Sequence, residues 1–285
     1  MKKTENSIEI SKFRSIYYFE FSKDFYHEPE RHNSWEMVYV DSGSINAITN
    51  GIGCTLSEGQ AIFHEPMELH AHVSDKRVPN NMVVVSFVCE SEKMDFFKGK
   101  TFSLDKTSKT LLSLFLEEAK NTYGEVPGDF SKASLPEISE KEFGAYQLLT
   151  SHFAEFLIKL IRSDNGHKVV SSRHSRDIAN NSACELICEH MKRNISSPLK
   201  ISDVCDRFFI GKTQLCKIFQ EFTGKSPMEY YNELKVKEAK KLLRDKKMSA
   251  SQISDCLGYS SIHNFSRTFR KFTGVSPTQY KKSIR

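Results

Sequence analysis

Two segments near the C-terminal end carry the side chains best suited to reading nucleic-acid bases. Gln214 and Asn264 have the amide geometry that pairs with adenine, and Arg267 has the guanidinium fork that pairs with guanine. Cations that can contact guanine or position a helix on phosphates lie close to them in the sequence: Lys217, Arg270 and Lys271. These residue types recur about fifty positions apart, so they predict two elements that read the major groove of double-stranded DNA.

A second set of polar residues lies in the N-terminal part of the chain. His32, Glu36 and His70 offer two imidazoles and one carboxylate, a set that suits Fe(II) or Mn. Three interpretations are open: the residues ligate a metal, they line a pocket for a small effector, or they satisfy one another at a rim. We favour the second, because small-ligand sites are apolar hollows with a few polar groups. The three residues are therefore candidate effector-binding residues, and neither a metal nor a cofactor is expected.

Nothing in the sequence supports catalysis directly. We find no nucleophile–base pair, no phosphate-binding glycine loop and no acid pair, so the chain is not expected to be an enzyme. The seven cysteines are odd in number and show no Cys-x-x-Cys spacing. Cys184 and Cys188 are about one helical turn apart, but no second pair completes a zinc site. Reduced thiols are therefore expected.

The region from Ile201 to Tyr280 contains one pattern twice. When the chain is shifted by fifty positions, residues fall on their own kind. The matching pairs are Phe219 and Phe269, Phe222 and Phe272, Thr223 and Thr273, Gly224 and Gly274, Ser226 and Ser276, Pro227 and Pro277, and Tyr230 and Tyr280. Two copies are too few for a solenoid, so the repeat indicates a pair of equivalent modules.

Each copy has the pattern of a helix, a tight turn and a second helix. The modules are expected at about 201–222 and 250–272, joined by a long helix at about 229–244. Gly224 and Gly274 follow the second helices, where a left-handed residue closes the last turn. A proline shortly after each glycine prevents the helix from continuing. The sequence therefore predicts two helix-turn-helix modules.

The second helix of each module is amphipathic. At about 100° per residue, Leu215, Ile218, Phe219 and Phe222 share one face of the first helix, and Phe265, Phe269 and Phe272 share the matching face of the second. The opposite face of each of these helices is polar. One polar face is ordinary for a solvated helix, but polar faces at equivalent positions of both copies favour a surface that contacts DNA. The candidate DNA-binding residues are Lys212, Thr213, Gln214, Lys217, Ser261, His263, Asn264, Arg267, Arg270 and Lys271.

The spacing of the modules fits the repeat of DNA. Successive major grooves on one face of the double helix are about 34 Å apart. A joining helix of about sixteen residues is roughly 24 Å long. With the radii of the modules added, the two second helices can reach successive grooves.

Charge is distributed unevenly. Residues 184–285 contain 20 Lys+Arg and 10 Asp+Glu, a net charge of +10. The totals are 41 and 36, so residues 1–183 hold the remaining 21 and 26, a net charge of −5. A basic C-terminal part on an acidic N-terminal part is typical of a nucleic-acid-binding domain attached to a domain with another task.

Residues 1 to about 100 contain short β-rich runs separated by Gly and Asn-Gly turn signals, a pattern typical of a sandwich or barrel. The expected strands are 15–21, 36–40, 44–49, 60–64, 68–73 and 82–88. Helical periods follow at 106–123 and at about 139–162, with a polar stretch around Pro127, Gly128 and Pro136 between them. The second helix has a wide apolar stripe, which covers the sheet or pairs with its counterpart in a second subunit.

The domain boundaries follow from these patterns. We expect a sensor and dimerisation domain at 1–165, a linker at 166–180 that is rich in Ser, Asn, His and Arg, and a DNA-binding domain at 181–285. No apolar run approaches the roughly 20 residues that span a bilayer, and none follows the basic start. Neither a membrane span nor a signal peptide is therefore expected, and the predicted location is the cytoplasm.

The C-terminal hundred residues resemble the DNA-binding domain of AraC/XylS-type transcription regulators. The resemblance rests above all on the run from Ile253 to Tyr280, Ile-Ser-Asp-Cys-Leu-Gly-Tyr-Ser-Ser-Ile-His-Asn-Phe-Ser-Arg-Thr-Phe-Arg-Lys-Phe-Thr-Gly-Val-Ser-Pro-Thr-Gln-Tyr. The chain departs from the family pattern at Cys205 and Ser254, where the family has alanine. It also departs at Lys235, where the family has an arginine, and this exchange is expected to weaken a bidentate contact.

The N-terminal part resembles the cupin-like sensor domain found in many regulators of this type. The run His32 to Gly43 is similar to the first cupin motif, and Gly59 to His70 is similar to the second. Metal-binding cupins begin the first motif with His-x-His, whereas Glu30 occupies the earlier of those positions here. This departure argues against a metal.

Together the resemblances imply an α+β protein of two domains. The N-terminal domain is expected to be a cupin-like β-barrel with accessory helices, and the C-terminal domain all-α. The implied function is transcription regulation, as an activator controlled by a small effector such as a sugar. The expected partners are double-stranded DNA, the effector and a second copy of the chain, with RNA polymerase as a further candidate. Two alternatives stay open: an N-terminal domain that binds a protein partner, and a metal-dependent cupin enzyme fused to a DNA-binding domain.

Overall fold

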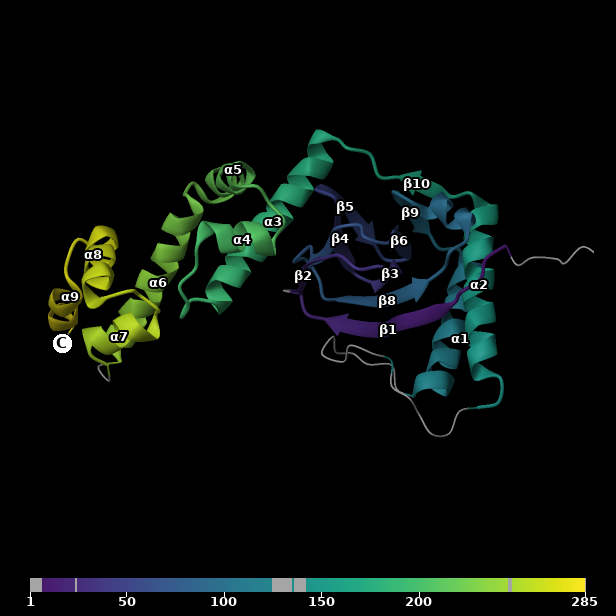
Figure 1. Ribbon diagram of the computed structural model, residues 1–285, viewed down its shortest axis with the longest axis horizontal. Coiled ribbons are helices and arrows are strands. Elements are labelled where there is room, and N and C mark those ends of the chain that lie inside the picture. The colour runs from purple at the N-terminus through teal and green to yellow at the C-terminus, as the bar shows by residue number, and fades with distance from the viewer. Residues whose placement is uncertain (1–6, 24, 125–134, 136–141, 246–247, 285) are drawn as a thin grey trace, which may run out of the picture. The chain divides into compact units, whose positions relative to one another are not determined.

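The chain divides into two compact units, Met1–Ala179 and Asn180–Arg285. The computed structural model describes residues 7–23, 25–124, 135, 142–245 and 248–284. The expected two-part α+β organisation is confirmed, because the first unit is rich in antiparallel strands and the second is helical (Figure 1).

The described strands of the N-terminal unit form two sheets. The larger has the order β1-β8-β3-β6-β9-β10 and the smaller the order β2-β7-β4-β5, and neighbouring strands run antiparallel. The bounds are β1 Lys12–Phe21, β2 Tyr26–Glu30, β3 Trp35–Ser42, β4 Ser44–Thr49, β5 Ile52–Ser57, β6 Gln60–His64, β7 His70–Ser74, β8 Asn80–Val88, β9 Lys100–Ser103 and β10 Gly166–Lys168.

The larger sheet is buried on both faces. Because successive side chains of a strand point to opposite faces, β3 contributes to two cores. Met37 and Tyr39 belong to the core shared with the helices α1 (Lys106–Tyr123) and α2 (Ala145–Ser163), which cover the outer face of the sheet (Figure 1). Val38 joins the core that the two sheets share. The unit therefore has three layers: the small sheet, the large sheet and the helices.

The strand and helix expectations agree with this unit in most places. The strands β4 and β6 and the helix α1 span the residues predicted for them, whereas β2, β5, β9, β10 and a short 3-10 helix at Glu92–Phe97 were not predicted. The second helix begins at Ala145, later than expected. Parts of the predicted polar stretch and helix start (Pro127, Gly128, Pro136 and Ser139) lie outside the described residues. The closed cupin-like barrel stays a prediction, because the described strands pair in two sheets.

The stripe on α2 packs against the large sheet. Leu149, Phe153, Phe156, Leu157 and Leu160 are buried in the core that α2 shares with α1 and the sheet. Phe143 and Tyr146, which were expected in the same stripe, are exposed instead, since they lie at or before the start of the helix. The stripe thus covers the sheet, and pairing with a second subunit stays a prediction.

The predicted linker at 166–180 contains regular structure, and the division between the two units falls at its end, between Ala179 and Asn180. Gly166–Lys168 forms β10, which pairs with β9, and the helix α3 already begins at Arg173 and continues to Arg193. These residues show no apolar period, so neither the strand nor the start of the helix was predicted. A strand of three residues is too short to show one, and the start of α3 is mostly exposed.

The C-terminal unit contains two helix-turn-helix modules. The first is α4 (Ile201–Arg207) with α5 (Lys212–Thr223), and the second is α7 (Ala250–Cys256) with α8 (Ile262–Thr273). The helix α6 (Pro227–Arg244) joins them, and α9 (Pro277–Ser283) follows the second. Residues of α6, α7 and α8 share one core, built around Val236, Ala239, Leu243, Ile253, Leu257, Phe265 and Phe269.

The helix ends follow local sequence signals. Gly224 and Gly274 have φ of 69° and 80°, so the expected left-handed caps of α5 and α8 are confirmed. The prolines that follow do more than stop a helix. Pro227 and Pro277 each occupy the first turn of the next helix, and the hydroxyl of the preceding serine caps it.

The repeat is not uniform at the turn of each module. The first helices start at 201 and 250, an offset of 49, whereas the second helices start at 212 and 262, an offset of 50. The second turn is therefore one residue longer. The left-handed position is occupied by Phe209 (φ 51°) in the first turn and by Gly258 (φ 60°) in the second.

Candidate functional site

The helices α5 and α8 each bury one face and expose the other. Leu215, Ile218 and Phe219 are buried on α5, and Phe265 and Phe269 are buried on α8. Phe222, expected on the apolar face, is 39% exposed because it lies in the last turn. The predicted DNA-binding residues lie on the outward faces: Lys212, Thr213, Gln214, Lys217, Ser261, His263, Arg267, Arg270 and Lys271 are exposed, and Asn264 is partly buried.

Some of these side chains have partners within the unit. Ser261 caps α8, since its hydroxyl accepts a hydrogen bond from the backbone N–H of Asn264 at 3.2 Å. The Asn264 side chain in turn accepts from the Arg267 guanidinium at 3.4 Å. On α5, the Gln214 amide donates to the Asn180 side chain at 3.0 Å. Ser261 thus orders the start of α8, and Asn264 orients Arg267.

Lys235, which stands where the resemblance expects an arginine, is buried on α6 with 4% of its surface exposed. Its Nζ donates to the Ser197 carbonyl at 3.2 Å and lies over the rings of Tyr231 and Tyr259. The Tyr231 hydroxyl donates to the same carbonyl at 2.6 Å. Burial lowers the pKa of Lys235 to about 8. The residue therefore ties α6 to the loop before α4.

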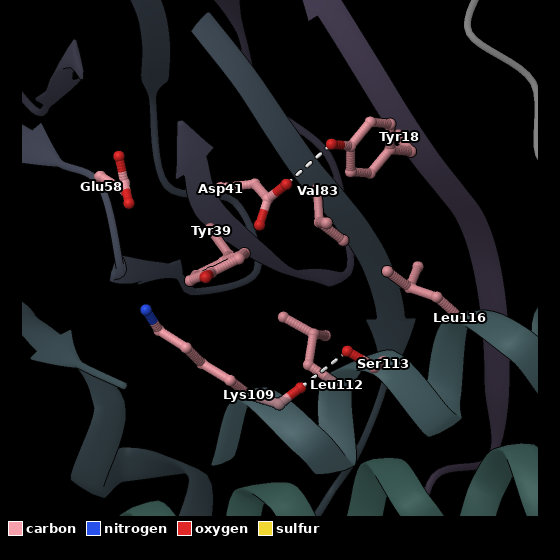
Figure 2. Close-up of a pocket in the computed structure, with 9 residues that line it drawn as sticks. All are labelled: Tyr18, Tyr39, Asp41, Glu58, Val83, Lys109, Leu112, Ser113 and Leu116. Atoms are coloured by element: carbon pink, nitrogen blue, oxygen red, sulfur yellow. Dashed lines mark hydrogen bonds between the residues drawn. The ribbon is translucent and has the colours of Figure 1, made fainter. Parts of the chain in front are cut away.

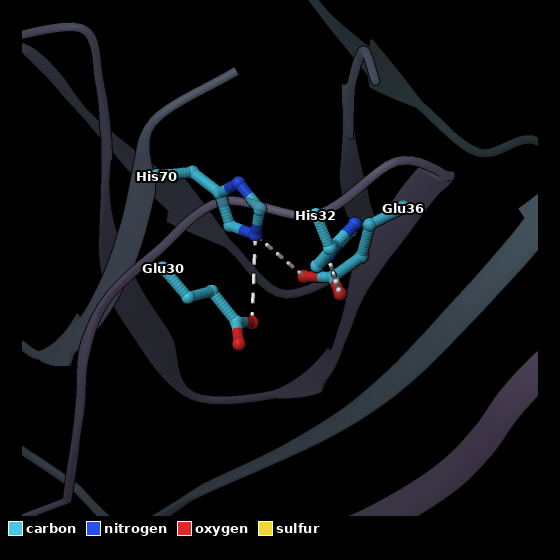
Figure 3. Close-up of side chains that lie close together, drawn as sticks. All are labelled: Glu30, His32, Glu36 and His70. Atoms are coloured by element: carbon cyan, nitrogen blue, oxygen red, sulfur yellow. Dashed lines mark hydrogen bonds and ion pairs between the residues drawn. The ribbon is translucent and has the colours of Figure 1, made fainter. Parts of the chain in front are cut away.

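In the N-terminal unit, His32, Glu36 and His70 lie together with Glu30 (Figure 3). Glu30 ends β2 and His70 begins β7, and the two are paired across the small sheet. Glu36 comes from β3 of the large sheet, so the cluster bridges both sheets. One ligand atom from each of the four residues lies within 4.8 Å of the others.

Three of the four side chains in the cluster are oriented by residues outside it. Ser34 Oγ lies 2.9 Å from His32 Nδ1, and Ser86 Oγ donates to Glu36 Oε2 at 3.0 Å. The Nδ1 of His70 lies 3.0 Å from the Glu68 carbonyl oxygen. Because a carbonyl only accepts, this nitrogen carries the proton. The other ring nitrogen, Nε2, is thereby directed at the two glutamates (Figure 3).

The electrostatics of the cluster are those of buried, opposed charges. Burial opposes ionisation of Glu36, but the hydrogen bond from His32 and the contact with His70 outweigh it and hold the pKa of Glu36 well below its ordinary value. Burial likewise opposes the charged form of His70, yet Glu30 and Glu36 raise its pKa to about 10. The cluster thus attracts positive charge to its centre.

A second layer of histidines lies behind the cluster, and sequence reasoning missed it. His64 stacks on His70 with ring centroids 4.3 Å apart, and its Nε2 lies 3.0 Å from His72 Nε2. Burial and the neighbouring His70 lower the pKa of His64 to about 3, so this layer is neutral at pH 7. The sequence contains a signal for this layer. His70 and His72 are two positions apart on one strand, so their side chains point to the same face.

A pocket of about 380 Å³ lies elsewhere in the unit, between the large sheet and α1 (Figure 2). Its polar lining is mixed. Tyr18 donates to Asp41 at 2.7 Å, and burial together with Asp41 and Glu58 raises the pKa of Tyr39 to about 12. The pocket is lined by Tyr18, Tyr39, Asp41, Glu58, Val83, Lys109, Leu112, Ser113 and Leu116. It contains none of the predicted effector residues, because His32, Glu36 and His70 converge on one another instead.

Comparisons with known proteins concern mainly the C-terminal unit. Residues 204–283 match a family model described as a helix-turn-helix domain. The raffinose operon transcriptional regulatory protein RafR of Pediococcus pentosaceus is 28% identical over 99 residues, which make up 35% of this chain and 36% of RafR. The matched part is thus about a third of the length of that relative.

Two further similarities extend over most of the chain. The uncharacterized HTH-type transcriptional regulator YfiF of Bacillus subtilis is 24% identical over 261 residues, covering 88% of this chain and 77% of YfiF. A structure of ToxT from Vibrio cholerae is 16% identical and covers 94% of this chain and 97% of that chain, with a TM-score of 0.32. At this TM-score the likeness carries no conclusion about what the N-terminal unit binds. None of the helices in the described parts of this chain combines the length and apolar composition that crossing a membrane requires.

Proposed function

We propose that this chain, whose residues 204–283 form a helix-turn-helix domain of the AraC type, is a sequence-specific DNA-binding transcription regulator. The observation that carries the proposal is the extent of the matched domain. It covers both modules, from within α4 to the end of α9, and the second helix of each module exposes a polar face. One chain therefore offers two elements to the major groove.

The proposed division of labour follows the chemistry of the exposed side chains. Gln214 and Asn264 read adenine and Arg267 reads guanine, because their donors and acceptors match those base edges. Arg270 and Lys271 hold phosphates, which gives affinity without sequence preference. The remaining contacts are assigned to Lys212, Thr213, Lys217 and His263, and Ser261 positions the start of α8.

The N-terminal unit is proposed to receive a small effector that changes how a dimer presents its DNA-binding domains, with activation as the output. The pocket of Figure 2 supports this role, since its volume lies in the range of small-ligand sites. Two carboxylates, two phenols and the Lys109 ammonium suit a hydroxyl-rich molecule such as a sugar. For such coupling the effector must bind one arrangement of the dimer better than the other.

Selection of bound sequences from random DNA by the purified full-length protein tests the proposal. Two half-sites about one helical turn apart are expected. The winning sequence should bind at least about a thousandfold more tightly than scrambled DNA at the same salt concentration. If no sequence is enriched, with and without a sugar panel, and binding only weakens with salt, the protein is a non-specific DNA binder and the proposal is wrong.

A further inference from the structure

We propose that Glu30, His32, Glu36 and His70 form a binding site for one divalent first-row metal ion such as Mn(II), Fe(II) or Zn(II). The set offers two imidazole nitrogens and two carboxylate oxygens, which are the donors these ions accept. The inference concerns the N-terminal unit and does not depend on DNA binding.

The spacing of the donor atoms fits one ion. Bonds of about 2.0–2.2 Å from a central metal place opposite donors at most about 4.4 Å apart. The four donor atoms lie within 4.8 Å of one another, so an inward movement of a few tenths of an ångström completes the coordination. His32 Nε2 and Glu36 Oε2, 3.2 Å apart, already have the separation of neighbouring ligands.

An unpartnered nitrogen at the centre of the cluster is an independent observation. His70 is 1% exposed, and its Nε2 has no hydrogen-bond partner. The nearest carboxylate oxygens, of Glu36 and Glu30, are 3.4 and 3.6 Å away. A charge-assisted hydrogen bond would be about 2.7–2.9 Å long. The Nε2 atom of His70 therefore points between the two carboxylates at ion-pair distance and forms a hydrogen bond with neither (Figure 3).

The surrounding contacts hold the ligands in the orientation that a metal needs. A metal-binding imidazole commonly donates its other N–H to a carbonyl or carboxylate, which fixes the tautomer. The His70 Nδ1 contact with the Glu68 carbonyl has this form, and Ser34 contacts the corresponding nitrogen of His32. Ser86 holds the Glu36 carboxylate in the same way.

A divalent ion would also match the charge of the ligand set. Two carboxylates with two unprotonated imidazoles carry a charge of −2, and the ion would take the place of the protons that pair the histidines with Glu30 and Glu36 in its absence. Glu36 is buried, and the ion pairs that the structure gives it are with His32 and His70. The argument against a metal from the missing His-x-His pattern therefore fails, because Glu30 supplies an oxygen donor in place of the first imidazole.

The test uses the purified full-length protein without DNA, stripped with a chelator and titrated calorimetrically with Mn(II), Zn(II) and, under anaerobic conditions, Fe(II). One ion per chain is expected to bind with a Kd on the order of micromolar or tighter. The melting temperature should rise on binding, because the ion links the two sheets and binds only the folded state. If none of the three ions binds stoichiometrically, the proposal is wrong, whatever the protein does with DNA.

Substitutions at the two more exposed ligands locate the site with little risk to the fold. The side chains of Glu30 and His32 are 39% and 28% exposed, so Glu30→Gln and His32→Gln should fold. Each is expected to weaken binding by at least about tenfold, since second-shell changes alone cost 10–100-fold. Glu65→Gln, which changes an exposed carboxylate paired with Lys98, is the matched control and should bind as the wild type does.

NMR spectra of the wild-type protein can show directly which histidines lie next to the bound ion. Mn(II) is paramagnetic, so substoichiometric Mn(II) should broaden the ring signals of His32 and His70 in NMR spectra, together with those of His64 and His72, which lie against His70. Undiminished binding in both variants, or broadening of other histidines while His32 and His70 stay sharp, would place the metal elsewhere and overturn the assignment.

Discussion

Among single residues, the pairing of Asn264 with Arg267 bears on the proposal that α8 reads a base pair. The guanidinium donates to the amide oxygen at 3.4 Å, while the Asn264 Nδ2 donates to Ser260 at 3.1 Å. A long side chain that is held by a neighbour loses less rotational freedom when it binds. We therefore expect that removing the Arg267 side chain reduces the sequence preference of DNA binding more than removing any other side chain of α8.

Replacing Arg267 with alanine should cost about 1–3 kcal/mol of binding to the selected site and relax preference at one base pair. Lys271→Ala is the matched control on the same helix. It should weaken binding to selected and scrambled DNA alike, because a phosphate contact carries no sequence information. Fluorescence anisotropy with both DNAs at one salt concentration measures the difference. Equal losses for Arg267→Ala on both DNAs would show that Arg267 does not read a base.

The burial of Lys235 predicts that the free energy of unfolding rises with pH over a defined range. Burial lowers its pKa to about 8, whereas lysine ordinarily titrates at 10.5. Between these values the unfolded chain keeps the proton and the folded chain releases it. The contribution of Lys235 to the free energy of unfolding therefore rises with pH across this window and is constant below it.

The change to test is Lys235→Met, which keeps an apolar stem and removes the titrating group. Urea unfolding between about pH 7 and about pH 9.5 should show a steeper rise in stability for the wild type than for this variant. Lys237→Met, at an exposed position of the same helix, should leave the slope unchanged. Parallel profiles for the wild type and Lys235→Met would refute the titration of Lys235 in this range.

At the scale of elements, the turn of the second module depends on Gly258. Its φ is 60°, a region that side chains disfavour, and a Cβ added there would lie 2.5 Å from the Ser196 carbonyl oxygen. Ser196 belongs to the loop that Tyr231 and Lys235 bind through Ser197. The close approach of the turn to this loop connects the second module with the segment before the first.

Gly258→Ala should destabilise the C-terminal unit more than Gly274→Ala. Both glycines have positive φ, so both substitutions cost about 1–2 kcal/mol from backbone conformation. Only the first also creates a clash, which adds about 1–3 kcal/mol, because a Cβ at Gly274 meets nothing within 4 Å. Chemical denaturation of the two variants measures the difference. Equal losses would mean that the loop moves away from the turn at no cost.

For the whole molecule, the proposed function gives the two units separate tasks, and the effector proposal can be tested apart from DNA. A panel of mono- and disaccharides is expected to include at least one that raises the melting temperature. Asp41→Asn, which changes a carboxylate of the pocket in Figure 2, should abolish that shift. Arg267→Ala should retain it. If no saccharide shifts the wild type, a sugar effector is excluded, and a shift that survives Asp41→Asn would place the effector elsewhere.

The helix-turn-helix modules could be predicted from the amino-acid sequence alone, because their signals are local. The left-handed glycines after α5 and α8, the serine caps and the apolar faces each depend on residues within one or two turns. The helix α1 was predicted for the same reason. The difference in net charge between the two halves of the chain follows from the residue counts alone.

The combinations of residues that lie far apart in the chain could not be predicted from the sequence. In the sequence, Glu30 is an argument against a metal, yet the pairing of β2 with β7 places it beside His70 and makes it the fourth residue of the cluster. The burial of Lys235 against Ser197, Tyr231 and Tyr259 and the contact of Gly258 with Ser196 likewise join segments far apart in the chain. Such contacts depend on strand register and helix packing. Periodicity shows which face of an element is buried, but it does not show which element lies against that face.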